Sequence, residues 1–201
     1  MPSDPLVLAF DTSAAHCAAA LLCADTVLAA RSEAMGRGQA ERLMPLLGEL
    51  LDEAGKSWSD LDRIGVGIGP GNFTGIRISV SAARGLALGL GIPAIGVSGF
   101  EIIRHGPMDD TDSGIRASYA VIAGPRDQVY LQDESGHVEL GHFFVDPPGC
   151  AFLDDDWRAN AIALAQIAAH KPPAERPAPL YIRPADAAPS RDAPPVILDD
   201  A

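Results

Sequence analysis

GVGIGPGNFTGIRISVSAARGLALGLGIPAIG, residues 65–96, is the stretch of sequence that decides the fold. Its apolar start predicts a buried strand at 63–68, and its apolar end predicts another strand at 94–97. Between them the pattern predicts a tight turn and a long helix over 74–90. The stretch is therefore typical of a strand, helix and strand in an α/β sheet.

A glycine and proline turn joins the first of these strands to the helix. Gly69, Pro70 and Gly71 fit a tight turn, because glycine accepts a positive φ and proline presets its own φ. Asn72 or Thr74 can cap the helix, since a side-chain oxygen at that position accepts from a free N–H group of the first turn.

The predicted helix has two faces. One face is apolar at helical spacing, which is typical of packing on the sheet, and it carries Ile76, Val80, Ala83, Ala87 and Leu90. The other carries small residues four apart, namely Ser81, Gly85 and Gly89. Glycine lowers helix propensity, which is tolerable where another backbone must approach closely. We therefore expect this helix to pack on its own sheet and on something else.

Composition limits the class of protein. The chain has 201 residues, 47% hydrophobic and 21% charged, enough for one large domain or two small lobes. Its formal net charge of −12 argues against a nucleic-acid binder that relies on a broad basic surface. Residues 101–201 hold 8 basic and 17 acidic side chains, so the second half is the more acidic one.

The expected compartment is the cytoplasm. Three cysteines without CxxC spacing make a disulfide framework or a zinc site a weak prediction; they are Cys17, Cys23 and Cys150. The chain opens without the pattern of a signal peptide. The apolar run 73–97 contains Arg77 and Arg84, which argues against a membrane span.

The first half of the chain predicts a mixed sheet. Short apolar strands at 6–11, 16–22 and 26–31, joined by tight turns, form an antiparallel meander. A helix over 38–54 follows a polar loop and carries a leucine stripe. The order of three strands, helix, strand, helix and strand predicts an α/β lobe, antiparallel first and parallel later.

The second half predicts a smaller unit. A turn-rich acidic segment, 106–114, marks the expected boundary between a first lobe at 1–105 and a second at 106–201. We expect strands there at 118–123, 128–132 and 140–145. An alanine-rich helix is expected at 157–170, directly after three aspartates. In the proline-rich tail only 180–183 and 196–198 are apolar enough to dock.

Patterns for independent catalysis fail on residue type or context. Residues 55–57, Gly-Lys-Ser, end like a P-loop, but position 50 is Leu and a helix precedes them. Residues 96–100 nearly make a nucleophile elbow but lack its final glycine. The turn Asp11, Thr12, Ser13 fits either a phosphate-binding loop or a simple hairpin end. We predict neither a catalytic residue nor a metal site.

Three segments together resemble the family of bacterial threonylcarbamoyladenosine biosynthesis protein TsaB. They are LAFDTSAAHCAAALL, ERLMPLLGELLDEAG and GIGPGNFTGIRISVSAARGLALGLGIPAIGVSGFE, and the resemblance covers residues 6–104 almost continuously. It implies a two-lobed actin-like ATPase fold of the sugar-kinase type with mixed sheets. The second lobe of this chain is short and proline-rich, so we expect it to be reduced.

The resemblance also implies a function. Members of the family are non-catalytic scaffold partners of a metal-bearing subunit, TsaD, which transfers threonylcarbamoyl to the adenosine beside the anticodon of tRNAs reading ANN codons. An ATPase, TsaE, completes the assembly. Where the catalytic relative carries a His-x-x-x-His metal pair, this chain has Arg-Gly-Gln-Ala-Glu at 37–41. We therefore expect a heterodimer with TsaD that meets tRNA only indirectly.

Two sets of site residues follow from the resemblance. The partner contact maps onto the two helices of the first lobe, at Leu43, Leu46, Leu47, Leu50, Arg77, Ser81, Arg84, Gly85, Leu88 and Gly89. The motif residues near a possible nucleotide are Asp11, Thr12, Ser13, Gly69, Pro70, Gly71, Phe73, Thr74 and Gly75. We expect no cofactor on the chain alone, and ATP or ADP only at the interface with the partner.

Alternative functions remain open at this point. One is a stand-alone hydrolase, a glycoprotease-like peptidase, and another is an ATPase or small-molecule kinase of the actin-like fold. The missing metal pair, nucleophile elbow and P-loop argue against both. A third is a homodimer that buries the same helices.

Overall fold

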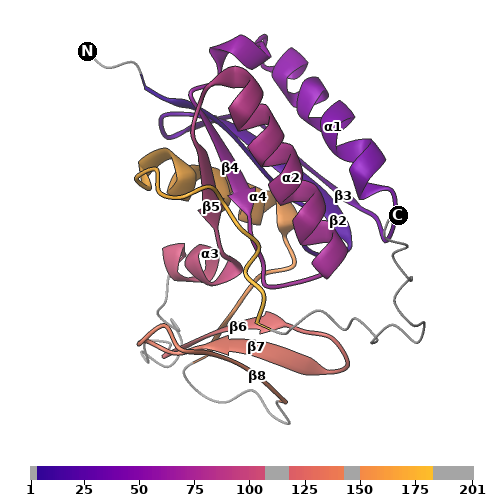
Figure 1. Ribbon diagram of the computed structural model, residues 1–201, viewed down its shortest axis with the longest axis vertical. Coiled ribbons are helices and arrows are strands. Elements are labelled where there is room, and N and C mark those ends of the chain that lie inside the picture. The colour runs from indigo at the N-terminus through magenta and orange to yellow at the C-terminus, as the bar shows by residue number, and fades with distance from the viewer. Residues whose placement is uncertain (1–3, 107–117, 143–149, 183–201) are drawn as a thin grey trace, which may run out of the picture.

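The computed structural model describes residues 4–106, 118–142 and 150–182 (Figure 1). Within these residues the chain forms a five-stranded sheet and a four-stranded sheet. In the view of Figure 1 the larger sheet, with helices α1 and α2, lies above the smaller one. The two sheets are the cores of the two lobes.

The first sheet has the strand order β3-β2-β1-β4-β5. Its strands are β1 (Leu6–Asp11), β2 (His16–Cys23), β3 (Thr26–Ala34), β4 (Arg63–Gly67) and β5 (Ala94–Val97). The first three pair antiparallel, and β4 and β5 continue from β1 in parallel. This is the predicted mixed sheet, and the meander and the parallel crossovers lie on opposite sides of β1.

Two helices cover one face of this sheet. They are α1 (Gln39–Glu53) and α2 (Phe73–Leu90). Alternate side chains of β1, including Leu8 and Phe10, pack with the leucines of α1 and with Ile76 and Val80 of α2. The Asn72 side chain accepts a hydrogen bond from the Gly75 N–H, which confirms it as the N-cap of α2.

The other face of the first sheet is covered by α4 (Trp157–His170). The opposite set of strand side chains, such as Val7 and Ala9, packs against Leu164 and the small residues of this helix. A Cβ at Gly65 would lie 2.9 Å from Ala168, so glycine there permits the close approach of helix and sheet. The expected boundary at 105/106 assigns α4 to the second lobe, but its packing belongs to the first, because its alanine face matches that sheet.

The second sheet has the order β8-β7-β6-β9. Its strands are β6 (Tyr119–Ala123), β7 (Gln128–Gln132), β8 (Val138–His142) and β9 (Cys150–Phe152). Helix α3 (Gly99–His105) contributes Phe100 and Ile103 to its core. Ser98 and Glu101 form a capping box at the start of α3, so this serine is a helix cap.

Three strands differ from the prediction. Strand β3 continues to Ala34, because its hydrogen-bonded pairing with β2 extends that far. Its charged side chains also pair with α1: Arg31 binds carboxylates of that helix, and Glu33 accepts from an arginine of it. Strand β8 begins two residues earlier than predicted, and 143–145 lie outside the described residues. Strand β9 was not predicted; it has only three residues and pairs in parallel with β6.

Residues 171–182, which we call the strap, run from the end of α4 past β5 to the second sheet (Figure 1). Lys171 Nζ donates to the Gly96 carbonyl at 2.8 Å, and Leu180 N donates to the Ile68 carbonyl at 2.8 Å. Leu180 and Ile182 pack on the core of the second sheet. The predicted docking at 180–183 is thus confirmed as far as 182, whereas 196–198 lies outside the described residues.

The helices described here are all too short or too polar to cross a membrane. The longest is α2, whose 18 residues include Arg77 and Arg84. Both arginines are exposed and lie on the outer face of the helix.

Candidate functional site

The outer face of α2 is open along most of its length. Ser81, Arg84, Gly85 and Gly89 are exposed, and Leu88 keeps 77% of its side chain accessible. A Cβ added at Gly85 or Gly89 would meet no atom of the described residues within 4 Å. The small-residue face predicted from the sequence therefore lies on the surface, where another backbone can approach closely.

The leucines of α1 lie elsewhere. Leu43, Leu46, Leu47 and Leu50 are between 0% and 1% exposed and pack against the first sheet. Their assignment to a partner contact is wrong, because an apolar stripe at helical spacing faces the core here. The exposed side of α1 instead carries Met44, with 41% of its side chain accessible.

A network of charges links the exposed edge of α1 to β3. Arg42 donates to Glu33 and Glu49 at 2.6–2.7 Å, and Arg31 donates to Glu49 and Glu53 at 2.8 Å. The hydrogen bonds from Arg42 hold the pKa of both Glu33 and Glu49 below the usual range. The pairs are largely solvent-exposed, so they orient α1 more than they stabilise the fold.

The start of α2 carries an aromatic and arginine cluster. The Phe73 and Tyr181 rings stack with centroids 4.9 Å apart, and the Arg77 guanidinium lies 3.8 Å from the Phe73 centroid. Arg77 Nε also donates to the Tyr181 hydroxyl at 2.8 Å. Tyr181 is 42% exposed. The strap thereby adds a tyrosine to the outer face of α2, next to two of the predicted site residues.

The Asp-Thr-Ser turn at 11–13 and the glycine-rich segment at 69–75 meet in a tight backbone contact. Thr12 Oγ1 donates to the Gly75 carbonyl at 2.7 Å, and Asn72 N donates to the Ser13 carbonyl at 2.6 Å. A Cβ at Gly71 or Gly75 would overlap the backbone of the β1–β2 turn. Among the remaining motif residues, Gly69 has φ 95° and precedes a cis Pro70, and Thr74 is exposed. The sequence motifs thus serve first to join β1 to α2.

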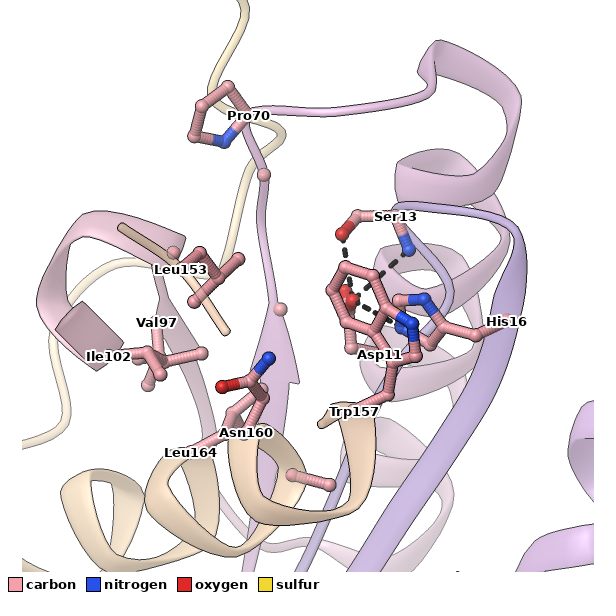
Figure 2. Close-up of a pocket in the computed structure, with 14 residues that line it drawn as sticks. Asp11, Ser13, His16, Pro70, Val97, Ile102, Leu153, Trp157, Asn160 and Leu164 are labelled. Carbon is pink, nitrogen blue, oxygen red and sulfur yellow. Dashed lines mark hydrogen bonds and ion pairs between the residues drawn. The ribbon is translucent and has the colours of Figure 1, made fainter. Parts of the chain in front are cut away.

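A small pocket lies between the lobes beside this contact (Figure 2). Asp11 Oδ2 accepts from Ser13 Oγ at 2.7 Å and lies 2.9 Å from His16 Nε2. Trp157 of α4 stacks on the buried His16 ring, with centroids 4.2 Å apart. Figure 2 shows Trp157 lying across this cluster, with Asn160 and Leu164 on the same helix. The start of α4 therefore closes the cleft over the Asp11 carboxylate.

The volume of the pocket decides what it can hold. It encloses about 30 Å³, whereas sites for drug-sized ligands measure roughly 300–1,000 Å³. A nucleotide therefore does not fit the cleft in this arrangement. Asp11 Oδ1 and His16 Nδ1 are buried without a hydrogen-bond partner among the described residues, and water can supply the partners they lack.

The aspartates before α4 act as helix caps. The Asp156 side chain accepts from Ala159 N at 3.0 Å, and Asp154 Oδ1 accepts from Asp156 N at 2.9 Å. Over the described ranges, no group of three or more His, Cys, Asp or Glu side chains is placed to hold a metal ion.

Comparison with known proteins decides the family. A family model described as "TsaD: tRNA N6-adenosine threonylcarbamoyltransferase" matches residues 32–153, more than half of the chain. The chain belongs to this family. Within it the chain is a TsaB/YeaZ-like protein, as the curated relatives and the solved structures agree.

The curated relatives include two bacterial proteins named "tRNA threonylcarbamoyladenosine biosynthesis protein TsaB". The one from Escherichia coli is 35% identical over 134 residues, 65% of this chain and 57% of the relative. The one from Bacillus subtilis is 39% identical over 97 residues, 48% of this chain and 42% of the relative. The alignments thus span about half the length of these relatives.

The solved structure of YeaZ from Pseudomonas aeruginosa is similar over most of the chain. It matches with a TM-score of 0.65 and 28% identity, covering 89% of this chain and 100% of that one. The predicted fold class, a two-lobed α/β protein with mixed sheets, is confirmed.

Sequence reasoning missed three residues of the cleft and of the cluster at the start of α2. Trp157 and His16 close the cleft, and Tyr181 completes the cluster at the start of α2. Each of them contacts a residue that lies between 104 and 141 positions away in the sequence. No local pattern can therefore indicate the contact. The one available signal was Leu-Tyr-Ile at 180–182, an apolar run in a proline-rich tail.

Proposed function

We propose that this TsaB/YeaZ-like chain is a non-catalytic subunit of the machinery that adds threonylcarbamoyl to the adenosine beside the anticodon of tRNAs reading ANN codons. In this proposal it binds and activates a TsaD-type catalytic subunit. The family and the names of the relatives support a part in threonylcarbamoyladenosine synthesis. The observation that carries the binding role is the open outer face of α2, with the exposed Leu88 in its last turn.

The chemistry of this face suits a protein partner. Glycines at 85 and 89 leave room for a second helix or strand, and Leu88 offers apolar area that a partner can bury. Arg77 is already held by Phe73 and Tyr181, so its position is fixed before binding. A preorganised side chain loses less entropy when a complex forms.

The cleft supports a scaffold more than a catalyst. Asp11 accepts from Ser13 and pairs with His16, so the serine hydroxyl is bonded to a carboxylate and has no imidazole as its base. Trp157 covers the same group. We therefore expect any ATP or ADP to bind at the interface with the partner, where a TsaE-type ATPase would also act. The phosphate contacts with tRNA would be made by the partner.

The test is co-purification with the TsaD-type subunit of the same genome, with tRNA modification assayed with and without this chain. We expect a 1:1 complex and loss of modification when the chain is omitted. Gly85→Leu should lower the affinity about tenfold or more, because overpacking a close contact costs ~1–3 kcal/mol and ~1.4 kcal/mol is a factor of ten.

Ala159→Leu is the matched control. It adds the same side chain at an exposed helix position on α4, which covers the opposite face of the first sheet. Unchanged affinity for Gly85→Leu, or an equal loss for Ala159→Leu, would place the interface elsewhere. A chain that hydrolysed ATP or peptide alone, and lost this activity on Asp11→Ala, would overturn the scaffold role.

A further inference from the structure

A second hollow, distinct from the cleft, lies at the C-terminal end of α2. We call it the strap groove, since it runs between the last turns of α2, the start of β5 and strap residues 173–177. It encloses about 520 Å³. Its walls are mostly apolar, and its lining includes Ala87, Leu88, Ile92, Pro93, Pro173 and Pro177.

Two arginines supply the charge of the strap groove. Arg84 and Arg176 line it and are exposed, and none of its described lining residues is acidic. Neither arginine has a hydrogen bond or ion pair with any other residue in the described part of the chain. In a chain of net charge −12, an apolar groove with two unpaired cations is complementary to an apolar segment that carries acidic residues.

The chain itself contains such a segment. Residues 194–200 read Pro-Pro-Val-Ile-Leu-Asp-Asp, three large apolar side chains followed by two carboxylates. We propose that this segment binds in the strap groove, with the aliphatic side chains of 196–198 against its apolar walls and Asp199 and Asp200 beside the two arginines.

The length of the connecting chain permits this contact. The described residues end at 182, next to Tyr181, which stacks on Phe73 at the start of α2. Arg84 lies eleven residues further along the helix, about 17 Å away at 1.5 Å per residue. Residues 183–195 can span up to about 40 Å when extended, so the segment reaches the groove with slack.

Occupation of the groove would cover part of the outer face of α2. Gly85 and Leu88 line the groove and also belong to the proposed partner contact. Bound there, residues 194–200 compete with the partner, so the tail regulates assembly. This consequence, unlike the docking itself, rests on the proposed function.

The docking is tested on the full isolated chain, with a photo-activated benzophenone amino acid replacing Ile197 and mass spectrometry of the cross-linked peptides. We expect intramolecular cross-links to 84–94 and 173–177. Arg84→Glu with Arg176→Glu should lower their yield about tenfold. Adding Asp199→Arg and Asp200→Arg to that double variant should restore it.

Control substitutions separate specific pairing from net charge. Arg37→Glu with Arg126→Glu changes two exposed arginines outside the groove lining by the same amount and should leave the yield unchanged. Cross-links between two chains would identify a second copy as the occupant and overturn the proposal. So would cross-links elsewhere, or equal losses in both arginine pairs.

A second measurement tests the competition. A chain ending at residue 193 should bind the TsaD-type subunit more tightly than the full chain does. Equal affinities, with the cross-links as expected, would refute competition. Because cross-linking needs no partner, failure of the proposed function leaves the docking result unaffected.

Discussion

The division of leucines between core and surface gives the sharpest prediction. Leu47 on α1 is fully buried, whereas Leu88 on α2 is 77% exposed, and the same substitution can be made at both. Leu47→Ala should lower the free energy of unfolding by about 3 kcal/mol, within the ~2–5 kcal/mol found for buried leucines. Leu88→Ala should change it by less than ~0.5 kcal/mol.

The assay combines thermal unfolding by circular dichroism with calorimetric titration of the TsaD-type subunit. For a chain of this size, a loss of ~3 kcal/mol corresponds to a fall in Tm of roughly 6–12 °C. Leu88→Ala should keep its Tm but bind the partner about tenfold more weakly, as a residue worth ~1.4 kcal/mol does. Folded Leu47→Ala should bind with the affinity of the parent chain.

The reverse pattern would refute the reasoning. If Leu47→Ala kept its Tm and lost partner affinity, the leucines of α1 would be contact residues after all, and α1 would pack differently on the first sheet. If Leu88→Ala lowered Tm as much as Leu47→Ala, Leu88 would be a core residue rather than an exposed residue of the outer face of α2.

Three further predictions concern stability and reactivity. Gly85→Ala should stabilise the chain by up to ~1 kcal/mol, because the added Cβ meets no described residue and alanine favours a helix. Gly75→Ala should destabilise it by at least ~1–3 kcal/mol, because the added Cβ overlaps the β1–β2 turn. Urea unfolding distinguishes the two signs. Burial alone would raise the pKa of Glu101, but hydrogen bonds from the strap lysine and the α3 cap hold it below 4.5. Its stabilising contribution is therefore present above about pH 4.5 and lost as pH falls through the lowered pKa, so parent and Glu101→Gln should converge in acid-unfolding curves. Burial raises the pKa of the Cys17 thiol to about 12, so folded protein at pH 9 should be alkylated at Cys23 and not at Cys17, and equal rates would contradict the burial.

Local sequence predicted the central elements well because their signals are local. The strand at 63–68, the helix through residue 90 and the Asn72 cap all depend on residues within four positions of one another. The same holds for the antiparallel meander, whose turns and apolar runs are contiguous. Elements specified by neighbouring residues can be derived from pattern alone.

The site was only partly predictable for a physical reason. An amphipathic stripe shows that one face of a helix is buried, but not whether a sheet or another protein covers it, so the leucines of α1 were assigned to the wrong contact. The stack of His16 and Trp157 joins residues 141 positions apart. Only the folded chain brings such residues together.

The return of α4 to the first sheet has a consequence during synthesis. The last strand of that sheet ends at residue 97, but the helix that covers the second face of the sheet ends only at residue 170, so it is synthesised 73 residues later. At typical elongation rates this interval lasts about 4–15 s. Throughout it, Val7, Ala9 and Leu22 lack the helix that buries them in the folded chain. Apolar sheet surface that is exposed for this long promotes aggregation. We therefore expect the growing chain to depend on chaperones until α4 is complete.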